Sequence, residues 1–251
     1  MVGISYFASE NTAVPECVRQ LACGERITPV WVNGDGGITF QIGAGSARRF
    51  AKWVPTHLAP RLVAEAARLR WAIDFVRVPR VLDTGHDSTG SWLLTAGLPG
   101  DSAIADRWKA APAHAVRIAA TALRDFHDAL PVESCPFDWS VESRLAEARV
   151  AGTTSPLVDV PRPAIDRLVV CHGDACVPNT LIDDAGTSSG LVDLGSLGRA
   201  DRWADLAVAT WSTEWNYGPG WTGVHLAAYG VQPDDERTRY YRALWDLINP
   251  V

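Results

Sequence analysis

The sequence of 251 residues predicts an α+β fold, with a small N-terminal β lobe that contains one helix and a larger, mainly helical C-terminal lobe. Three observations predict this division. The first third of the chain carries short β-rich runs between turn residues, and the remainder carries longer segments with apolar residues at spacings of three and four. A Gly- and Pro-containing segment at 96–100 separates them. We therefore expect an N-terminal nucleotide-binding lobe over 1–95, a hinge over 96–100 and a C-terminal catalytic and acceptor-binding lobe over 101–251.

In the N-terminal lobe, the turn 33–37 between two β-rich runs holds three glycines and predicts a hairpin. Apolar residues at helical spacing predict an amphipathic helix over 59–73. Five short runs rich in β-branched and aromatic residues predict strands: 29–32, 38–42, 49–54, 78–83 and 91–95.

In the C-terminal lobe, five apolar-periodic segments predict helices: 114–130, 141–149, 203–214, 223–229 and 234–248. Short β-rich runs at 168–171, 180–182 and 191–192 predict strands within this helical part.

The most informative stretch leaves three polar residues at the ends of those strands: Asp174, Asn179 and Asp193. A carboxylate, a carboxamide five residues later and a second carboxylate at the end of the next strand form a set of hard oxygen donors suited to Mg²⁺. The spacing Asp-x-x-x-x-Asn also equals that of the protein-kinase catalytic loop, where the Asp receives the hydroxyl proton and the Asn holds metal. A polar β-hairpin with an accidental Asp and Asn is the alternative.

The motif His-Gly-Asp-x-x-x-x-Asn from His172 to Asn179, with Asp-Leu-Gly from Asp193, resembles the aminoglycoside phosphotransferase family, whose members are antibiotic kinases with a protein-kinase-like fold. The segments 134–138, 215–220 and 239–246 look most like the aminoglycoside 3′-phosphotransferase branch of this family. The resemblance implies that Asp174 orients the acceptor hydroxyl, that Asn179 and Asp193 bind Mg²⁺, and that His172 and Gly173 shape the loop.

Lys52 lies on the predicted strand after the glycine-rich turn and is the only lysine in the first hundred residues. The resemblance implies that Lys52 pairs with the phosphates of ATP or GTP and is held by Glu65 from the next helix. For the pair in isolation, the alternative is a surface lysine and a surface glutamate.

Two backbone regions complete the expected nucleotide site. Gly36 and Gly37, at the hairpin tip, could let backbone N–H groups approach phosphates, although such a turn is more often only a turn. The resemblance places the adenine at the hinge, where backbone groups of Thr95, Ala96 and Leu98 would bond to it.

Two aspartates near the start of the predicted helix 203–214 have architectural roles. Asp205 resembles the helix aspartate that bonds to the backbone of the catalytic loop and fixes its shape. Asp201 is expected to cap the start of the same helix.

The chain departs from the 3′-phosphotransferase branch between Arg144 and Arg167 and at its C-terminal end, 247–251. In that branch the first region is a longer insert with several acids that grip the drug's ammonium groups, whereas here it is short and nearly neutral. We therefore expect a weaker grip on common aminoglycosides. The remaining acids that could face a cationic acceptor are Glu214, Asp234, Asp235, Glu236 and Asp246.

The composition excludes several function classes. A net charge of −6 argues against nucleic acid as a partner, and no apolar run reaches the ~18 residues of a membrane span. The N-terminus does not resemble a signal peptide, and five cysteines make a disulfide framework unexpected, so we expect a cytoplasmic protein. A zinc site at Cys171, His172 and Cys176 is not expected, because no second Cys/His pair follows at ligand spacing.

We therefore expect an enzyme that uses Mg²⁺ to move the γ-phosphoryl of ATP, or GTP, to a hydroxyl of a cationic or sugar-like small molecule. The first candidate is an aminoglycoside at a 3′-type hydroxyl, and we expect a monomer or weak dimer. The alternatives are a kinase for another sugar or metabolite, and a nucleotide-binding pseudoenzyme. The intact set of Lys52, Asp174, Asn179 and Asp193 argues against a pseudoenzyme.

Overall fold

The computed structural model describes residues 6–153, 157 and 160–247. The expected helix end at 248, the altered chain end at 248–251 and parts of the neutral segment, at 154–156 and 158–159, lie outside the described residues. The chain divides into two compact units, which we call unit 1 (Met1–Asp74 and Val78–Leu98) and unit 2 (Phe75–Arg77 and Pro99–Val251). Among the described helices, none is long and apolar enough to cross a membrane.

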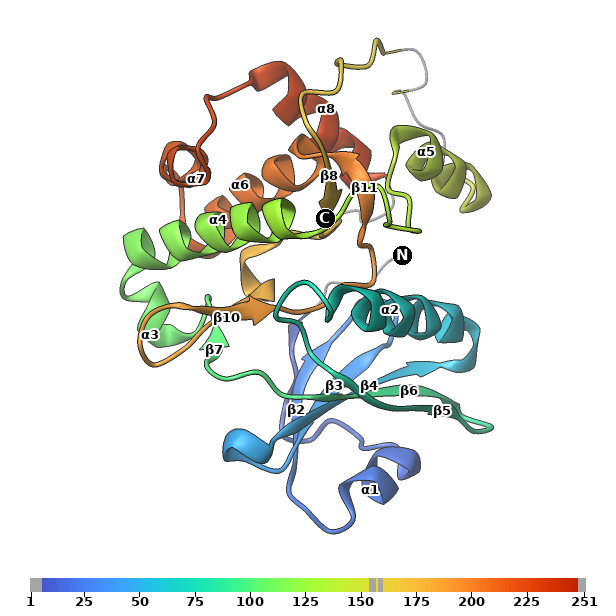
Figure 1. Ribbon diagram of the computed structural model, residues 1–251. Coiled ribbons are helices and arrows are strands. Elements are labelled where there is room, and N and C mark those ends of the chain that lie inside the picture. The colour runs from blue at the N-terminus through green and yellow to red at the C-terminus, as the bar shows by residue number, and fades with distance from the viewer. Residues whose placement is uncertain (1–5, 154–156, 158–159, 248–251) are drawn as a thin grey trace. The chain divides into compact units, whose positions relative to one another are not determined.

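Unit 1 is an antiparallel sheet of six strands in the order β1-β2-β3-β4-β6-β5, with α1 and α2 on opposite faces (Figure 1). A buried cluster joins α1 to one face through Val18, Phe40 and Leu94. The other face packs against the buried side of α2, including Leu62 and Leu69. The elements are β1 (Tyr6–Phe7), α1 (Glu16–Ala22), β2 (Ile27–Val32), β3 (Ile38–Ile42), β4 (Arg49–Pro55), α2 (Ala59–Ala72), β5 (Val81–His86) and β6 (Gly90–Ala96), with 3₁₀ turns at Gly45–Ala47 and Thr56–Leu58.

One expectation for unit 1 was wrong in detail, and one helix was not expected. The strand expected at 78–83 lies instead at Val81–His86, because Pro79 has no N–H with which to extend the ladder toward Val78. The helix α1 was not expected, since its seven residues make two turns and are too few to display a helical period. Pro15 stands just before its first turn with an extended backbone, and Cys23 ends it in the left-handed region.

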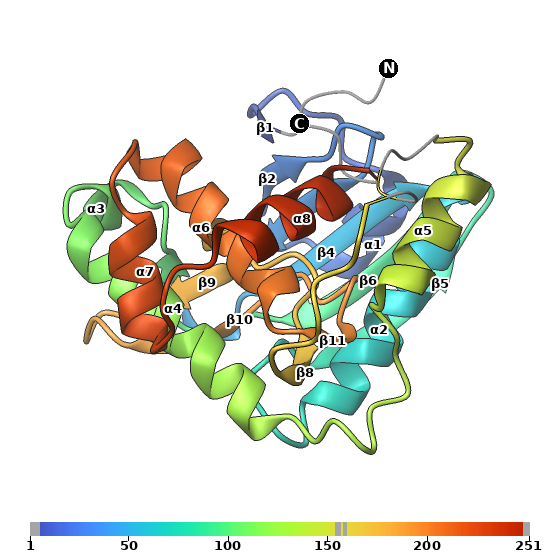
Figure 2. The same cartoon turned by 90° about the horizontal axis from the view of Figure 1, so that it is seen from above.

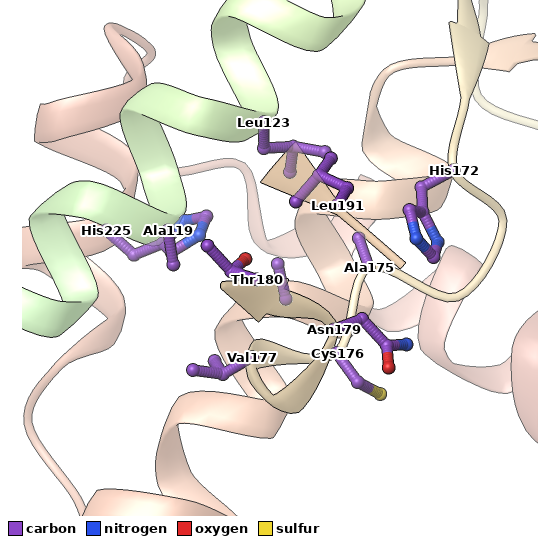
Figure 3. A pocket seen from close by; sticks show the side chains of 11 residues that line it. Ala119, Leu123, His172, Ala175, Cys176, Val177, Asn179, Thr180, Leu191 and His225 are labelled. Carbon is purple, nitrogen blue, oxygen red and sulfur yellow. The ribbon is translucent and has the colours of Figure 1, made fainter. Parts of the chain in front are cut away.

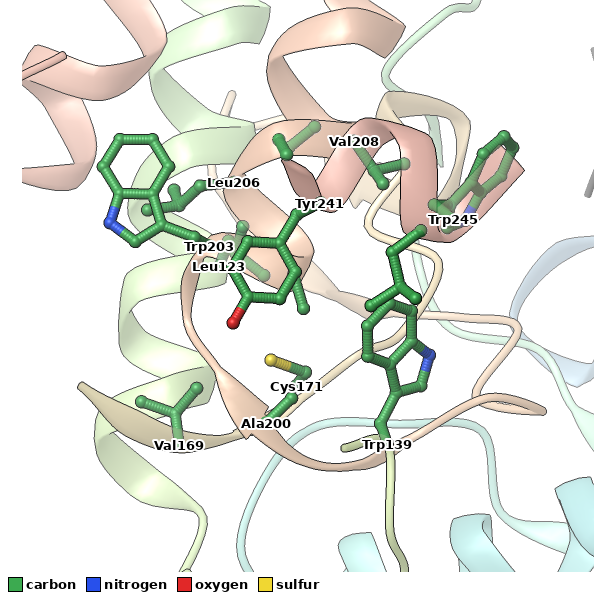
Figure 4. Close-up of a cluster of buried hydrophobic side chains, with 14 of the residues drawn as sticks. Leu123, Trp139, Val169, Cys171, Ala200, Trp203, Leu206, Val208, Tyr241 and Trp245 are labelled. Carbon is green, nitrogen blue, oxygen red and sulfur yellow. The ribbon is translucent and has the colours of Figure 1, made fainter. Parts of the chain in front are cut away.

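Unit 2 is mainly helical. Helix α7 packs on α4, and α8 packs on α6 (Figure 2). Side chains from α4, β8, β11, α6 and α8 form its largest buried cluster, part of which Figure 4 shows around Cys171 and Tyr241. The helices are α3 (Asp106–Lys109), α4 (Pro112–Ala129), α5 (Val141–Val150), α6 (Trp203–Tyr217), α7 (Thr222–Tyr229) and α8 (Asp235–Asp246).

Two small sheets in unit 2 carry the predicted loop. The first has the strand order β10-β9-β7, from β7 (Asp101–Ser102), β9 (Thr180–Ile182) and β10 (Ser188–Leu191). The second pairs β8 (Leu168–Cys171) with β11 (Gly198–Asp201). The α+β fold class is confirmed, and all five helices expected after the hinge are present. Elements of two to four residues, namely β7, β11 and α3, were not expected.

Candidate active site

The predicted catalytic loop runs from β8 to β9 in unit 2. His172, Gly173 and Asp174 follow β8 directly, and a 3₁₀ turn, Val177–Asn179, leads into β9. Gly173 has φ 82°, and a Cβ at this position would lie 2.2 Å from the carbonyl oxygen of Ser196. Only glycine fits there, so the chain can turn sharply just before Asp174.

Asp205, on the first turn of α6, holds this loop by its backbone. Its Oδ2 accepts the N–H of His172 at 2.6 Å and its Oδ1 accepts the N–H of Gly173 at 2.8 Å. Oδ2 also accepts Nε2–H of His127 at 2.8 Å. Burial alone would raise the pKa of Asp205, but the hydrogen bond and charge of His127 lower it, so the carboxylate stays ionised. The expected role of Asp205 is confirmed.

The start of α6 is also held as expected. Asp201 Oδ1 accepts the N–H of Trp203, the first residue of α6, at 3.0 Å. Its Oδ2 accepts the N–H of Asp166 at 2.8 Å. Burial raises the pKa of Asp201. Asp201 therefore binds a backbone N–H at the start of the helix that carries Asp205, although the N-cap position itself is Arg202.

His172 connects the loop to the segment that ends at Asp193. Its Nε2 lies 2.9 Å from the carbonyl oxygen of Val192, which can only accept, so Nε2 carries the proton. Its Nδ1 then accepts a longer hydrogen bond, 3.3 Å, from the N–H of Asp174. The predicted role of His172 in shaping the loop is confirmed by this bridge.

Asp174 has one carboxylate oxygen, Oδ1, that is buried and has no hydrogen-bond partner among the described residues. Burial and the negative charge of Asp193 raise the pKa of Asp174. A buried acceptor without a donor is costly to the fold, and it suits a group that must receive a hydrogen bond from a ligand.

Asn179 and Asp193 surround this carboxylate with further oxygen atoms. Asn179 Nδ2 donates to the backbone oxygen of Asp174 at 2.9 Å and to its Oδ2 at 3.4 Å, which leaves the amide oxygen to bind a cation. Asp193 has φ 66°, an uncommon conformation for a residue other than glycine and one found often at functional sites. An amide oxygen and a carboxylate beside a second carboxylate form a donor set that fits Mg²⁺.

In unit 1, Lys52 and Glu65 form a close ion pair. Successive side chains of a strand point to opposite faces, and Ala51 and Trp53 belong to the α1 cluster, so Lys52 points to the face that α2 covers. Lys52 Nζ lies 2.6 Å from Glu65 Oε1, with the glutamate side chain 7% exposed and the lysine 25%. The surface alternative for this pair is wrong, because a buried carboxylate needs this partner.

The predicted role of Lys52 at the phosphates implies that Lys52→Ala lowers kcat by roughly 100-fold, the order of magnitude lost with one electrostatic contact to the transition state. Glu65→Gln should have a smaller effect of the same kind, because Glu65 acts by holding Lys52. Because Lys52→Ala removes the Lys52 partner of the buried Glu65, the double variant Lys52→Met with Glu65→Gln separates lost stability from lost catalysis. Lys109→Ala, at the other lysine of the chain, is the control. An unchanged kcat in Lys52→Ala would contradict the assignment.

The glycine-rich hairpin tip has the expected turn. Asn33 N–H donates to the Gly37 carbonyl at 2.7 Å, and Gly36 N–H donates to the Asn33 carbonyl at 2.9 Å. Gly36 has φ 94°, and a Cβ on Gly37 would lie 3.2 Å from both Asn33 Nδ2 and a methyl carbon of Val54. A role for Gly36 and Gly37 in phosphate binding stays a prediction.

The predicted adenine contacts lie at the end of β6 and just beyond it. Ala96 N–H donates to the Arg80 carbonyl at 2.9 Å, and the Leu98 carbonyl accepts an N–H of Arg48 at 2.6 Å. Thr95 Oγ1 lies 3.4 Å from the Phe50 carbonyl. The contacts of Thr95, Ala96 and Leu98 with a nucleotide stay predictions.

Sequence reasoning missed the residues behind the loop. His127, on α4, joins Asp205 to Tyr229 of α7, with 2.7 Å between His127 Nδ1 and the Tyr229 hydroxyl. Ser212, on α6, accepts the N–H of Val177 at 3.0 Å. His127 lies 78 residues from its partner Asp205, and the spacing along the chain carries no signal for such a pair.

His127, Cys171 and Asp205 place their potential ligand atoms within 4.8 Å of one another. However, the Cys171 thiol donates to the Asp201 carbonyl at 3.3 Å, and burial raises its pKa well above the usual value. A thiol that keeps its proton is a poor metal ligand. These three residues therefore serve as the support of the loop.

A cavity of about 10 Å³ lies behind the loop, between α4, α6 and α7 (Figure 3). Its lining includes Asn179, Thr180 and His225, and the Nδ1 of His225 is buried without a hydrogen-bond partner among the described residues. The volume suits a single water molecule. Burial lowers the pKa of His225 from 6.5 to about 4.

This depressed pKa predicts a pH-dependent stability. Between about pH 6.5 and 4 the unfolded chain binds a proton at His225 that the folded chain does not, so the free energy of unfolding falls as pH falls through this window. The difference between 6.5 and about 4 corresponds to about 3 kcal/mol. In urea unfolding at several pH values, the free energy of unfolding of His225→Gln should fall less steeply with pH than that of the unmodified chain. His86→Gln, at an exposed histidine, is the control. Equal slopes in His225→Gln and the unmodified chain would contradict this.

Comparisons with known proteins place these observations in a family. The family model described as the phosphotransferase enzyme family (APH) matches residues 34–241. An aminoglycoside 3′-phosphotransferase of Streptomyces fradiae is 36% identical over 229 residues, which cover 78% of this chain and 83% of the relative. A streptomycin 3″-kinase of Streptomyces griseus is 36% identical over 235 residues, covering 79% of this chain and 84% of the relative.

A solved structure, aminoglycoside phosphotransferase APH(3″)-Id from Streptomyces rimosus, has the same fold. It superposes with a TM-score of 0.74 and 30% identity, over 93% of this chain and 99% of that one. The structure of that enzyme with ADP and streptomycin gives a TM-score of 0.68 at 30% identity, over 84% of this chain and 90% of that one. The predicted family and kinase-like fold are confirmed, and this chain belongs to the phosphotransferase enzyme family.

Proposed function

We propose that this chain transfers the γ-phosphoryl group of ATP, or GTP, to a hydroxyl of an aminoglycoside, at a 3′-type position. The observation that carries the proposal is the buried, unpartnered Oδ1 of Asp174, at the end of a loop that Asp205 holds by two backbone N–H groups. A hydroxyl is a weak nucleophile at neutral pH, and a carboxylate that lacks a donor can receive its proton.

In this reaction the acceptor oxygen bonds to the γ-phosphorus while the bond to the bridging oxygen of ADP breaks. Asp174 orients the hydroxyl and takes its proton. Lys52, held by Glu65, offsets the charge of the phosphates. Asn179 and Asp193 would hold Mg²⁺, which when bound neutralises phosphate charge. The protein otherwise contributes mainly by positioning the reactants.

A 3″-hydroxyl is the second candidate position, because a streptomycin 3″-kinase is as similar to this chain as a 3′-phosphotransferase is, at 36% identity. A kinase for another sugar or metabolite remains the alternative reading of the same site. We also place the protein in the cytoplasm, as a monomer or weak dimer.

The test is to incubate purified protein with Mg²⁺, ATP and either kanamycin A or streptomycin, and to follow ADP release and the product by mass spectrometry. We expect ADP release that depends on the acceptor, with one phosphoryl group on the product. The position of that group then follows from NMR. Nucleotide binding without acceptor-dependent ADP release would count against an aminoglycoside and favour another metabolite.

A further inference from the structure

Three tryptophans of unit 2 form a cluster that we call the tryptophan surface: Trp211 and Trp215 on α6 and Trp245 on α8. Ring centroids lie 4.7 Å apart for Trp211 and Trp215, 6.4 Å for Trp211 and Trp245, and 6.2 Å for Trp215 and Trp245. Trp215 is 43% exposed, and it is the one exposed tryptophan among the described residues. The exposed indole of Trp215 keeps a large apolar surface in contact with water. Burial of that surface by a ligand would be favourable, which makes this position a candidate binding site.

The tryptophan surface begins beside the catalytic loop. Ser212 of α6 touches the loop, because its hydroxyl accepts the N–H of Val177 at 3.0 Å. Trp211 and Trp215 lie one residue before and three residues after Ser212, on the neighbouring face of the helix.

Several acids of unit 2, among them Glu214 and Asp234, already have cationic partners. Glu147 pairs with Arg144 at 2.6 Å, and Asp166 pairs with Arg202 at 2.6 Å. Glu214 lies 3.7 Å from Arg242. Likewise, Asp234 is paired with Arg237 and caps α8. Asp159 lies outside the described residues. An acceptor that carries only ammonium groups would lose hydration without gaining these carboxylates as partners.

A planar guanidinium group has different needs. It is more weakly hydrated than ammonium and stacks on aromatic faces. The structure holds such a contact at this place, since the guanidinium carbon of Arg242 lies 5.5 Å from the Trp211 ring centroid. We propose that Trp215, supported by Trp211 and Trp245, binds a guanidinium group of the acceptor. This inference rests on the proposed function and narrows it to guanidinium-bearing aminoglycosides, in preference to those with ammonium groups only.

The test compares streptomycin, which carries guanidinium groups, with kanamycin A, which carries ammonium groups. In Trp215→Ala we expect the KM for streptomycin to rise about 10-fold, while the KM for kanamycin A, the KM for ATP and kcat stay within about twofold. Trp215→Phe, which keeps an aromatic face, should recover part of the loss. Val150→Ala, at a residue of unit 2 that is 90% exposed, is the matched control.

A parallel binding measurement separates this proposal from the proposed function. Titration calorimetry of streptomycin into Asp174→Asn protein, with and without Trp215→Ala, reports binding without turnover. The unmodified protein could phosphorylate no aminoglycoside and yet bind streptomycin more tightly than the Trp215→Ala variant does. That result would support guanidinium binding at the tryptophan surface and reject the proposed function. Turnover of streptomycin with an unchanged KM in Trp215→Ala would reject guanidinium binding at the tryptophan surface, while the proposed phosphotransferase function would still hold. A Trp215→Ala protein that only loses dimerisation, with acceptor binding intact, would also overturn guanidinium binding at this surface.

Discussion

Asp174→Asn should abolish phosphoryl transfer while leaving the protein folded. We expect kcat to fall roughly 100- to 10,000-fold, the range measured when a general base is removed. The asparagine keeps the shape of the side chain and the hydrogen bond that Asn179 makes to the backbone oxygen of residue 174. It removes the carboxylate that would receive the hydroxyl proton.

The same substitution should not lower the free energy of unfolding. Asp174 Oδ1 is buried without a partner, and both burial and the charge of Asp193 disfavour its ionised form. Such a group costs stability, as functional groups often do, so removing its charge should leave the melting temperature equal or higher. Thermal unfolding of both proteins, with and without ADP, measures this.

Asp193→Ala is the contrasting variant, because Asp193 is predicted to bind the metal. It should weaken binding of Mg²⁺-ATP as well as turnover, whereas Asp174→Asn should bind Mg²⁺-ATP like the unmodified protein. Turnover near the unmodified rate in Asp174→Asn, on an acceptor that the protein phosphorylates, would remove Asp174 from the reaction.

Sequence predicts those parts of the site whose residues lie close together along the chain. Asp174 and Asn179 are five residues apart on one loop, and Asp193 follows at the end of the next hairpin, so a short pattern carries their arrangement. The pair of Lys52 and Glu65 was also predictable, because a strand and the helix that follows it must pack together.

The part that sequence does not predict depends on residues far apart. His127 meets Asp205 only because α4 and α6 pack against each other, and no propensity or spacing encodes that contact. The tryptophan surface combines α6 with α8 in the same way. Short elements such as α1 and β11 were missed because tertiary contacts, and not local periodicity, stabilise them.

Asp205→Ala should cause the largest loss of stability of any substitution considered above. It removes the acceptor of three buried donors, the N–H groups of His172 and Gly173 and the Nε2–H of His127. Breaking a buried pair of this kind costs about 3–5 kcal/mol. For a chain of this size that corresponds to a fall in melting temperature of roughly 10 °C. Calorimetry measures it directly.

The control for Asp205→Ala is Asp138→Ala, at an exposed aspartate that accepts the N–H of Ser140 at 2.9 Å. Losing such an exposed hydrogen bond costs about 1 kcal/mol and should leave kcat unchanged. Asp205→Ala should also lower kcat at temperatures where circular dichroism shows it folded, because His172 and Gly173 then no longer hold Asp174 in place. The stability and kcat of Asp205→Asn should lie between those of Asp205→Ala and those of Asp138→Ala, since one amide oxygen can still accept from the loop. If Asp205→Ala unfolds early but keeps full kcat while folded, then the carboxylate supports only the fold, and the orientation of Asp174 has another origin.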